Sequence, residues 1–98
     1  MKLIVAVVRP FVIDRLIVAF EDMEHFPGVT IIDTEGYGQR VKTAEDAINP
    51  FKPNKRIEIV AEEEMVNPII ASIKEHAHTG RKGDGFVVVL NIEDSTLI

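Results

Sequence analysis

The sequence predicts an α+β domain in which an antiparallel sheet carries two helices on one face. Two observations support this fold class. Runs rich in β-branched residues alternate with amphipathic segments in the order β-α-β, and the same order returns after a long connection. A chain of 98 residues is long enough for one domain and too short for two, so we expect residues 1–98 to form a single unit.

Composition and charge argue against several classes of protein. The chain has no cysteine, which excludes a disulfide scaffold, a thiolate metal site and a cysteine nucleophile. The net charge of −5 argues against nucleic acid as a partner, because such binding depends on basic residues that neutralise phosphates. No apolar run is long enough to span a bilayer, and Arg9-Pro10 interrupts the N-terminal run, which therefore reads as a strand and not as a signal peptide. We therefore predict a cytoplasmic protein.

The first half of the chain reads as strand, helix and strand. Residues 3–8 are apolar at nearly every position, as in a central strand, and Pro10 ends the run because proline lacks an N–H donor. Residues 11–24 place apolar side chains on one helical face and charged side chains elsewhere. After a turn at 25–28, residues 29–37 form the second predicted strand.

A long connection separates the two halves. Residues 39–54 show little periodicity, so we expect a loop. Loops of this length inside a small domain are uncommon and often functional, and two interpretations stay open: an exposed hairpin extension or a partner-binding loop. Residues 55–60 alternate at first between polar and apolar side chains, which predicts a half-exposed third strand.

The second half ends with a helix and a strand. Residues 64–76 have an apolar face, and the three acids at 62–64 complement the positive end of the helix dipole. Pro68 is expected in the first turns, where its missing donor costs little. Residues 86–90 form the fourth predicted strand, and residues 95–98 are compatible with a small edge strand.

This order of elements is that of a ferredoxin-like split βαβ domain. With both helices on one side, the other face of the sheet is left open and must be covered by something. Because so short a chain buries a limited share of its own surface, self-association is the economical way to cover that face.

A glycine-rich segment, Thr-Gly-Arg-Lys-Gly-Asp-Gly at residues 79–85, connects the second helix to the fourth strand. Glycines allow positive φ and close approach of the backbone to a ligand, and exposed N–H groups of such a loop can surround an anion. Arg81 and Lys82 add positive charge. The alternative is a helix C-cap followed by a turn, with no ligand.

Several motifs keep a fixed order along the chain, and together they resemble one family. The motifs are Arg9-Pro10-Phe11 followed by Asp14, Thr30, Gly36-Tyr37-Gly38, residues 55–60 and residues 79–85. In this combination the chain resembles the PII signal-transduction proteins, in which 79–85 corresponds to the B-loop. The resemblance covers residues 1 to 90 and identifies a divergent member with a short T-loop and a truncated C-terminus.

The resemblance implies a homotrimer of ferredoxin-like subunits, with three clefts between subunits that bind an adenine nucleotide. It makes residues 39–54 the T-loop, which in the family contacts a target protein, so a target such as a membrane transporter is an expected partner. It also implies a signalling protein without a catalytic site of its own.

The resemblance also assigns residues to the cleft and to the loop. Gly83 and Gly85 would offer backbone N–H groups to phosphates, and Val7 would lie near the base. The full predicted nucleotide-binding set is Val7, Thr30, Gly36, Gly38, Glu58, Val60, Arg81, Lys82, Gly83, Asp84 and Gly85. The predicted partner-binding residues of the loop are Gln39, Arg40, Lys42, Glu45, Asp46 and Lys52.

Two departures from the family pattern concern the phosphates of the nucleotide. The family has a lysine directly after Gly-Asp-Gly, and here the residue is Phe86. The family also brings two C-terminal arginines to the distal phosphates, and no arginine follows Arg81. Since charge-assisted contacts contribute about 1.5–3 kcal/mol each, we expect ADP, AMP or another small anion in preference to ATP, or no nucleotide at all.

Other functions stay open as alternatives. His76-Ala77-His78 is a pair of potential metal ligands at a helix end, which leaves a metal-sensing or metal-binding PII-like protein as the runner-up. A trimeric structural adaptor that binds no ligand is the other alternative. No nucleophile is placed beside a base and no HExxH motif is present, so an enzyme is not expected.

Overall fold

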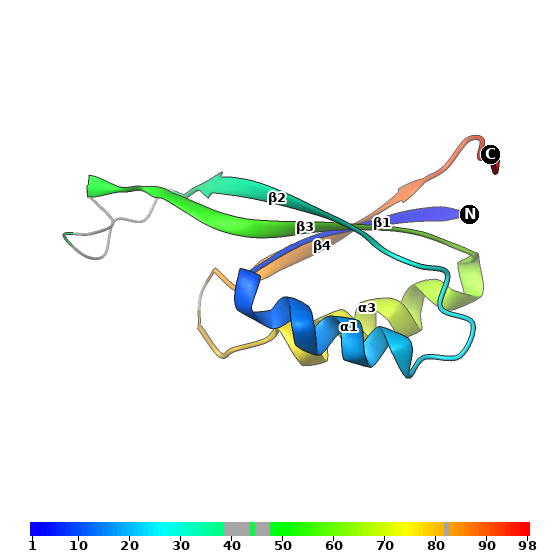
Figure 1. Cartoon of the computed structure of the whole chain (residues 1–98). Coiled ribbons are helices and arrows are strands. Elements are labelled where there is room, and N and C mark those ends of the chain that lie inside the picture. The colour runs from blue at the N-terminus through cyan, green and yellow to red at the C-terminus, as the bar shows by residue number, and fades with distance from the viewer. Residues whose placement is uncertain (39–43, 45–47, 82) are drawn as a thin grey trace.

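Strands and helices follow one another in the predicted order in the computed structural model, which describes residues 1–38, 44, 48–81 and 83–98 (Figure 1). The elements are β1 (Lys2–Val8), the short 3-10 helix η1 (Pro10–Val12), α1 (Ile13–Glu21), β2 (Thr30–Tyr37), β3 (Phe51–Ala61), α3 (Glu63–Ala77) and β4 (Gly85–Asn91). The predicted α+β class is therefore confirmed, as is the ferredoxin-like arrangement.

The sheet has the strand order β2-β3-β1-β4, and every neighbouring pair is antiparallel. The central strand β1 pairs with β3 on one side and β4 on the other, so that Val5 lies between Glu58 and Val88 in register. Both α1 and α3 cover the same face of this sheet (Figure 1). The predicted layers are confirmed.

The core lies between the sheet and the two helices. Alternate residues of β1 and β3 are buried there because side chains along a strand point to opposite faces. The helices contribute residues three or four positions apart, which share one helical face. The buried cluster consists of Ile4, Ala6, Val8, Val12, Leu16, Phe20, Ile57, Ile59, Ala61, Ile69, Ile73 and Ala77.

The strand β3 begins earlier than predicted, so the prediction that residues 51–54 belong to a loop is wrong. These residues pair with β2, with Gly36 opposite Lys52, and Lys52 is therefore a strand residue. Pro53 suggested a loop because proline cannot donate to a ladder. The strand tolerates it because β1 already ends opposite Lys55, so that Pro53 is paired on one side only.

Beyond Lys55, β2 and β3 therefore form a two-stranded ribbon, which we call the arm: residues 34–37 and 51–54. It extends past the helix layer (Figure 1). Most of the predicted partner-binding loop, Gln39, Arg40, Lys42, Glu45 and Asp46, lies outside the described residues. The arm is the described structure from which that segment emerges.

Helix boundaries and the C-terminal tail differ in detail from the predictions. The predicted helix 11–24 is the 3-10 turn η1 followed by α1, and it ends at Glu21. Pro68 is the sixth residue of α3, beyond the first four N–H groups that lack a helical partner, so it removes a helical hydrogen bond. Residues 95–98 form no strand, and that prediction was wrong. No helix in the described part of the chain is long and apolar enough to span a membrane.

The sheet face opposite the helices is apolar and uncovered in the single chain. Register places one set of residues on it, because neighbours across the ladder point to the same side. We call this side of the sheet the open face. Its apolar residues are Leu3, Val5, Val7, Ile32, Val60, Phe86, Val88 and Leu90, and the same register places the polar residues Thr30, Arg56 and Glu58 on it. Five of the apolar residues are large and exposed, with Phe86 at 56%. A largely apolar exposed surface of this kind is typical of a protein–protein contact.

Candidate functional site

The loop that joins α3 to β4 is organised around the carboxylate of Asp84. Arg9 donates from Nε to Oδ1 at 3.1 Å, and the backbone N–H of Thr79 donates to Oδ2 at 2.7 Å. The Thr79 hydroxyl also donates to Oδ1, and His78 Nδ1 lies 3.7 Å from Oδ2. We call Arg9, Thr79 and Asp84 the Asp84 cluster. It connects the residue after β1 to both ends of the loop.

These contacts hold the pKa of Asp84 well below its ordinary value of 3.8, at about 2. The largest cause is the hydrogen bond from the Thr79 hydroxyl, followed by the bond from the Thr79 N–H, and Arg9 adds a hydrogen bond and its charge. Each of these favours the ionised form. The carboxylate is therefore charged throughout the neutral range and keeps the loop closed on Arg9.

This depressed pKa predicts an acid-dependent opening of the loop. Because the folded-state pKa lies below the unfolded value, the stabilisation by Asp84 is complete above pH 3.8 and is lost as the pH falls toward about 2. The amide resonance of Thr79, followed by NMR, is expected to titrate with a midpoint near pH 2 in the wild type. In Asp84→Asn this titration should be absent, and the shift of Thr79 should indicate an altered loop at every pH.

A matched control is Asp33→Asn, which removes the acid of an exposed ion pair with Lys55 on β2 and β3. The Thr79 titration should persist in that variant. A Thr79 midpoint near pH 4 in the wild type would contradict the role given to the Asp84 cluster.

The glycines of the loop have a structural explanation that the sequence could not supply. Gly83 and Gly85 have φ of 85° and 121°, values that other residues rarely adopt. A Cβ on Gly85 would lie 1.8 Å from the Val7 carbonyl oxygen, so the strand β4 begins in close contact with the backbone of β1. The close approach that we expected toward a ligand is, at Gly85, an approach to the neighbouring strand.

Several predicted nucleotide-binding residues lie on one side of the sheet. Register places Thr30 opposite Glu58 on β3, and it places Val7 and Val60 on the same open face. The carboxylate of Glu58 is paired with Arg56, whose Nε lies 3.0 Å from Oε2. These four predicted residues therefore share a surface. The negative charge of Glu58 on this surface is already balanced by Arg56.

The remaining predicted residues lie at one end of that surface. One row of paired residues crosses the sheet at this end: Gly85, Val8, Lys55 and Asp33. Gly36 lies three residues beyond Asp33 along the arm, and Gly38 follows the end of β2. The glycine-rich loop and the base of the arm therefore meet at the same end of the sheet. Lys82 lies outside the described residues.

Two contributions were missed by the sequence analysis: the role of Arg9 and that of Thr79. In the sequence Arg9 is visible only as part of a motif that ends the first strand, although its side chain reaches a carboxylate 75 positions away. A threonine at the end of a helix followed by an acid in the same loop was the available signal, because hydroxyls and carboxylates commonly stabilise loops through local backbone contacts.

The two histidines of the metal alternative have different surroundings. His76 Nδ1 lies 2.8 Å from the carbonyl oxygen of Ser72 within α3, whereas His78 faces Asp84. Among the residues that the structure describes, no group of three or more histidine, cysteine or acidic side chains could hold a metal ion.

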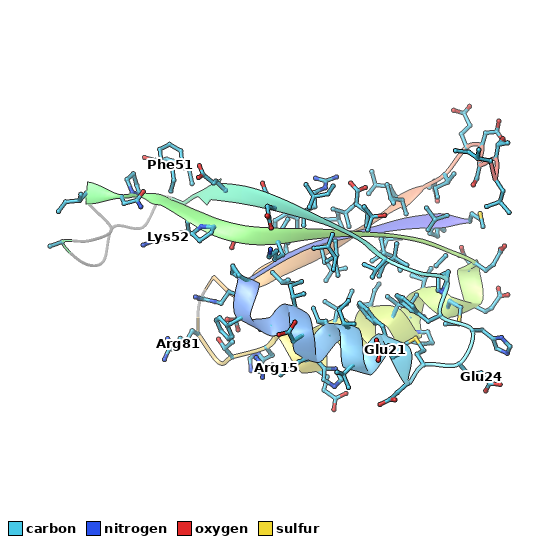
Figure 2. The ribbon with its side chains drawn as sticks, viewed as in Figure 1. Arg15, Glu21, Glu24, Phe51, Lys52 and Arg81 are labelled. Atoms are coloured by element: carbon cyan, nitrogen blue, oxygen red, sulfur yellow. The ribbon has the colours of Figure 1, made fainter. Side chains whose placement is uncertain are left out.

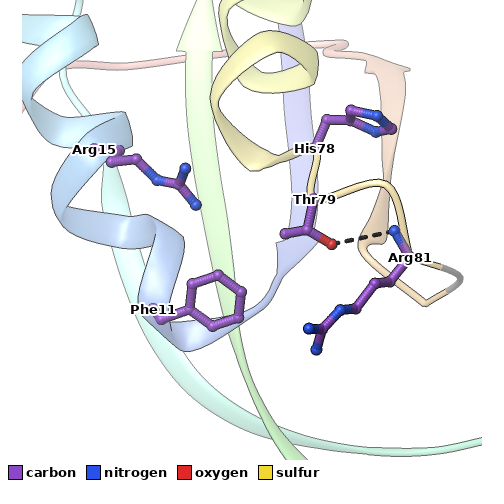
Figure 3. A pocket seen from close by; sticks show the side chains of 5 residues that line it. All are labelled: Phe11, Arg15, His78, Thr79 and Arg81. Atoms are coloured by element: carbon purple, nitrogen blue, oxygen red, sulfur yellow. Dashed lines mark hydrogen bonds between the residues drawn. The ribbon is translucent and has the colours of Figure 1, made fainter.

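Two pockets flank this end of the molecule. One, of about 420 Å³, is lined by Phe11, Arg15, His78, Thr79 and Arg81 (Figure 3). The other, of about 590 Å³, lies beside the arm and is lined by Pro10, residues 33–35 and residues 53–55. Neither pocket contains the predicted base-binding residues of the open face.

A family model for "Nitrogen regulatory protein P-II" matches residues 1–98, the whole chain. The chain belongs to the P-II family. A P-II protein of Bradyrhizobium diazoefficiens is 35% identical over all of this chain and 91% of its own length. P-II proteins of Azospirillum brasilense and Haemophilus influenzae are each 32% identical, over 96% and 95% of this chain and 88% and 87% of theirs.

Membership in the P-II family confirms the resemblance seen in the sequence and the prediction that this is no enzyme, since P-II proteins are signal transducers without a catalytic activity. The family also implies a homotrimer and the binding of an effector. The open face is an apolar surface available for contact between subunits.

Proposed function

We propose that this P-II protein is a regulatory homotrimer that binds ADP or AMP in preference to ATP in clefts between subunits. In this proposal the bound nucleotide controls a partner protein through residues 39–54. The observation that carries the proposal is the meeting of the glycine-rich loop, the base of the arm and the open face at one end of the sheet.

The geometry of the loop supports a role in binding phosphate. The Asp84 cluster holds Thr79 and Asp84, near the two ends of the loop, through three hydrogen bonds. A Cβ on Gly83 would meet a terminal nitrogen of the Arg9 guanidinium at 3.5 Å, so a cation lies against the glycine expected to face a phosphate. Exposed backbone N–H groups beside a cation suit an anion. Val7, Thr30, Glu58 and Val60 would then form the neighbouring surface for the base.

The preference for fewer phosphates rests on Phe86, which stands where the family has a lysine. Phe86 follows Gly-Asp-Gly, pairs with Val7 and has 56% of its surface exposed. It occupies the position at which a lysine would reach a phosphate. The missing charge-assisted contact costs about 1.5–3 kcal/mol, and this cost applies mainly to the distal phosphates.

The arm supports the proposed contact with a target. Tyr37 and Phe51 face each other across its outer end with ring centroids 5.5 Å apart, and both are exposed, at 70% and 52%. Lys52, the next residue of β3, points to the other side of the arm (Figure 2). Aromatic side chains of this kind are common at protein interfaces. We propose that the arm and residues 39–54 contact a target protein of the cytoplasm or its membrane, with a transporter as one candidate.

Nucleotide binding is tested by thermal stability. ADP or AMP at about 100 times its dissociation constant should stabilise the native protein by about 2.7 kcal/mol, and ATP at the same concentration should stabilise it less. Phe86→Lys should raise the affinity for ATP by at least about tenfold, because it restores one charge-assisted contact. Phe86→Leu is the control that removes the ring without adding charge.

Two results would contradict this preference. A shift with ATP larger than that with ADP would place additional phosphate contacts elsewhere in the trimer. No shift with any nucleotide would favour a structural adaptor without a ligand. A shift with zinc or copper alone that disappears in His76→Ala and His78→Ala would instead favour metal sensing.

A further inference from the structure

A pocket is lined by Phe11, Arg15, His78, Thr79 and Arg81, and of these only Arg81 belongs to the predicted nucleotide-binding set. Phe11 and Arg15 come from the helix layer, whereas Val7, Thr30, Glu58 and Val60 lie on the opposite, open face of the sheet. Figure 2 shows Arg15 on α1 and Arg81 on the loop at the same end of the helix layer. The pocket volume of about 420 Å³ falls in the range of small-molecule sites, roughly 300–1,000 Å³.

Positive charge gathers in this pocket although the chain as a whole is acidic. Arg15 and Arg81 belong to different elements, and both guanidinium groups extend toward the region of the Phe11 ring (Figure 3). Within the described ranges, no carboxylate lies in ion-pair distance of either group. His78 also lines the pocket. A guanidinium presents several donors in a plane, which suits carboxylate and phosphate oxygens.

The acid closest to this charge is already engaged. Asp84 lies 3.7 Å from His78, but its carboxylate accepts hydrogen bonds from Arg9 and from the hydroxyl and N–H of Thr79. It is therefore not available to neutralise Arg15 or Arg81. The positive charge of the pocket is left for a ligand.

Phe11 gives the pocket an apolar surface beside this charge. Its ring is 63% exposed, and the guanidinium carbon of Arg15 lies 5.9 Å from the ring centroid. An exposed aromatic ring next to cations suits a ligand with a flat or apolar body and an anionic group.

We propose that this pocket is a second site, which binds a small organic oxyanion: a phosphate or carboxylate held by Arg15 and Arg81, with its body against Phe11. The backbone N–H of Arg81 donates to the Thr79 hydroxyl at 3.3 Å, and that hydroxyl donates to Asp84. A ligand that fixes Arg81 therefore acts on the same loop whose other side faces the proposed nucleotide cleft.

The test is an NMR titration of the ¹⁵N-labelled full chain with phenyl phosphate, inorganic phosphate and benzoate. Amide shifts should be concentrated at residues 11, 15 and 78–81. Phenyl phosphate should bind on the order of tenfold more tightly than inorganic phosphate, since its ring packs on Phe11. Phe11→Leu should remove most of this difference. The tighter of phenyl phosphate and benzoate identifies which oxyanion the site prefers.

Charge variants complete the test. Arg15→Gln and Arg81→Gln should each weaken phenyl phosphate on the order of tenfold. Lys2→Gln is the control. Lys2 lies at the other end of β1, where it pairs with Glu63, and its loss also removes one positive charge, so the affinity for phenyl phosphate should not change. Amide spectra without ligand show whether each variant is folded.

Two outcomes would overturn the inference. Equal affinities for phenyl phosphate in the wild type and the three charge variants would indicate an adventitious ion only. Amide shifts spread over unrelated basic residues would indicate the same. Displacement of phenyl phosphate by ADP through the same residues would indicate a single site. Failure of ADP to bind at all would leave the phenyl phosphate result unchanged, so the two proposals can fail separately.

Discussion

Val88→Asp is expected to convert the trimer into monomers of 11.0 kDa. Val88 lies on the open face, paired with Val5 of the central strand and flanked along β4 by Phe86 and Leu90. Contact between subunits through this face would remove the new carboxylate from water without a partner, and that costs several kcal/mol per site. The cost recurs in every subunit, so association should fail at micromolar concentrations.

The adjacent residue provides a matched control. Val89 has almost the same exposure as Val88, 40% against 43%, but it pairs with Ile4 and so points to the helix side. Sedimentation equilibrium should give three times the chain mass for the wild type and for Val89→Asp, and the chain mass for Val88→Asp. A trimeric Val88→Asp would place the subunit contact on another surface.

Gly85→Ala is expected to reduce the free energy of unfolding by about 3 kcal/mol or more. A positive φ strains any residue other than glycine by roughly 1–3 kcal/mol, and forced overpacking adds a similar amount. At Gly85 both terms apply, since φ is 121° and the new Cβ would lie 1.8 Å from the Val7 carbonyl oxygen. The neighbour is backbone within a strand pair and cannot rotate away.

Substitutions at two other glycines allow backbone strain and overpacking to be measured separately, by urea denaturation at one fixed protein concentration. Gly28 has φ of 116° with no atom within 4 Å of an added Cβ, so Gly28→Ala should show the strain alone, about 1–2 kcal/mol. Gly38 has neither feature, and Gly38→Ala should be close to neutral. Equal losses for Gly85→Ala and Gly28→Ala would mean that β4 adapts to the added methyl group.

The fold could be predicted from the sequence because each element carries a clear local pattern. Residues 3–8 are a short apolar run rich in β-branched side chains, residues 55–60 alternate at first, and residues 64–76 have the spacing of a helix. The start of β3 could not be predicted in the same way. Pro53 is acceptable in that strand because β1 stops opposite Lys55, and this depends on the lengths of two strands that are far apart in the sequence.

The candidate site was predictable only in part, for a similar reason. The glycine-rich loop is visible as a local composition, and its acid could be named. The contact that gives Asp84 its role involves Arg9, at the other end of the chain, and no local pattern indicates it. The pocket at Phe11 was likewise invisible, because it forms where α1 and the loop meet in space.

The arm lies outside the part of the chain that specifies the fold. No described residue between Asp22 and Arg56 belongs to the fully buried core, which is built from segments on either side of that stretch. A side chain substituted near the outer end of the arm therefore contacts solvent or a partner, and the substitution disturbs few contacts of the core. Under the proposed function, the choice of partner can thus diverge through evolution while the same core continues to specify the subunit.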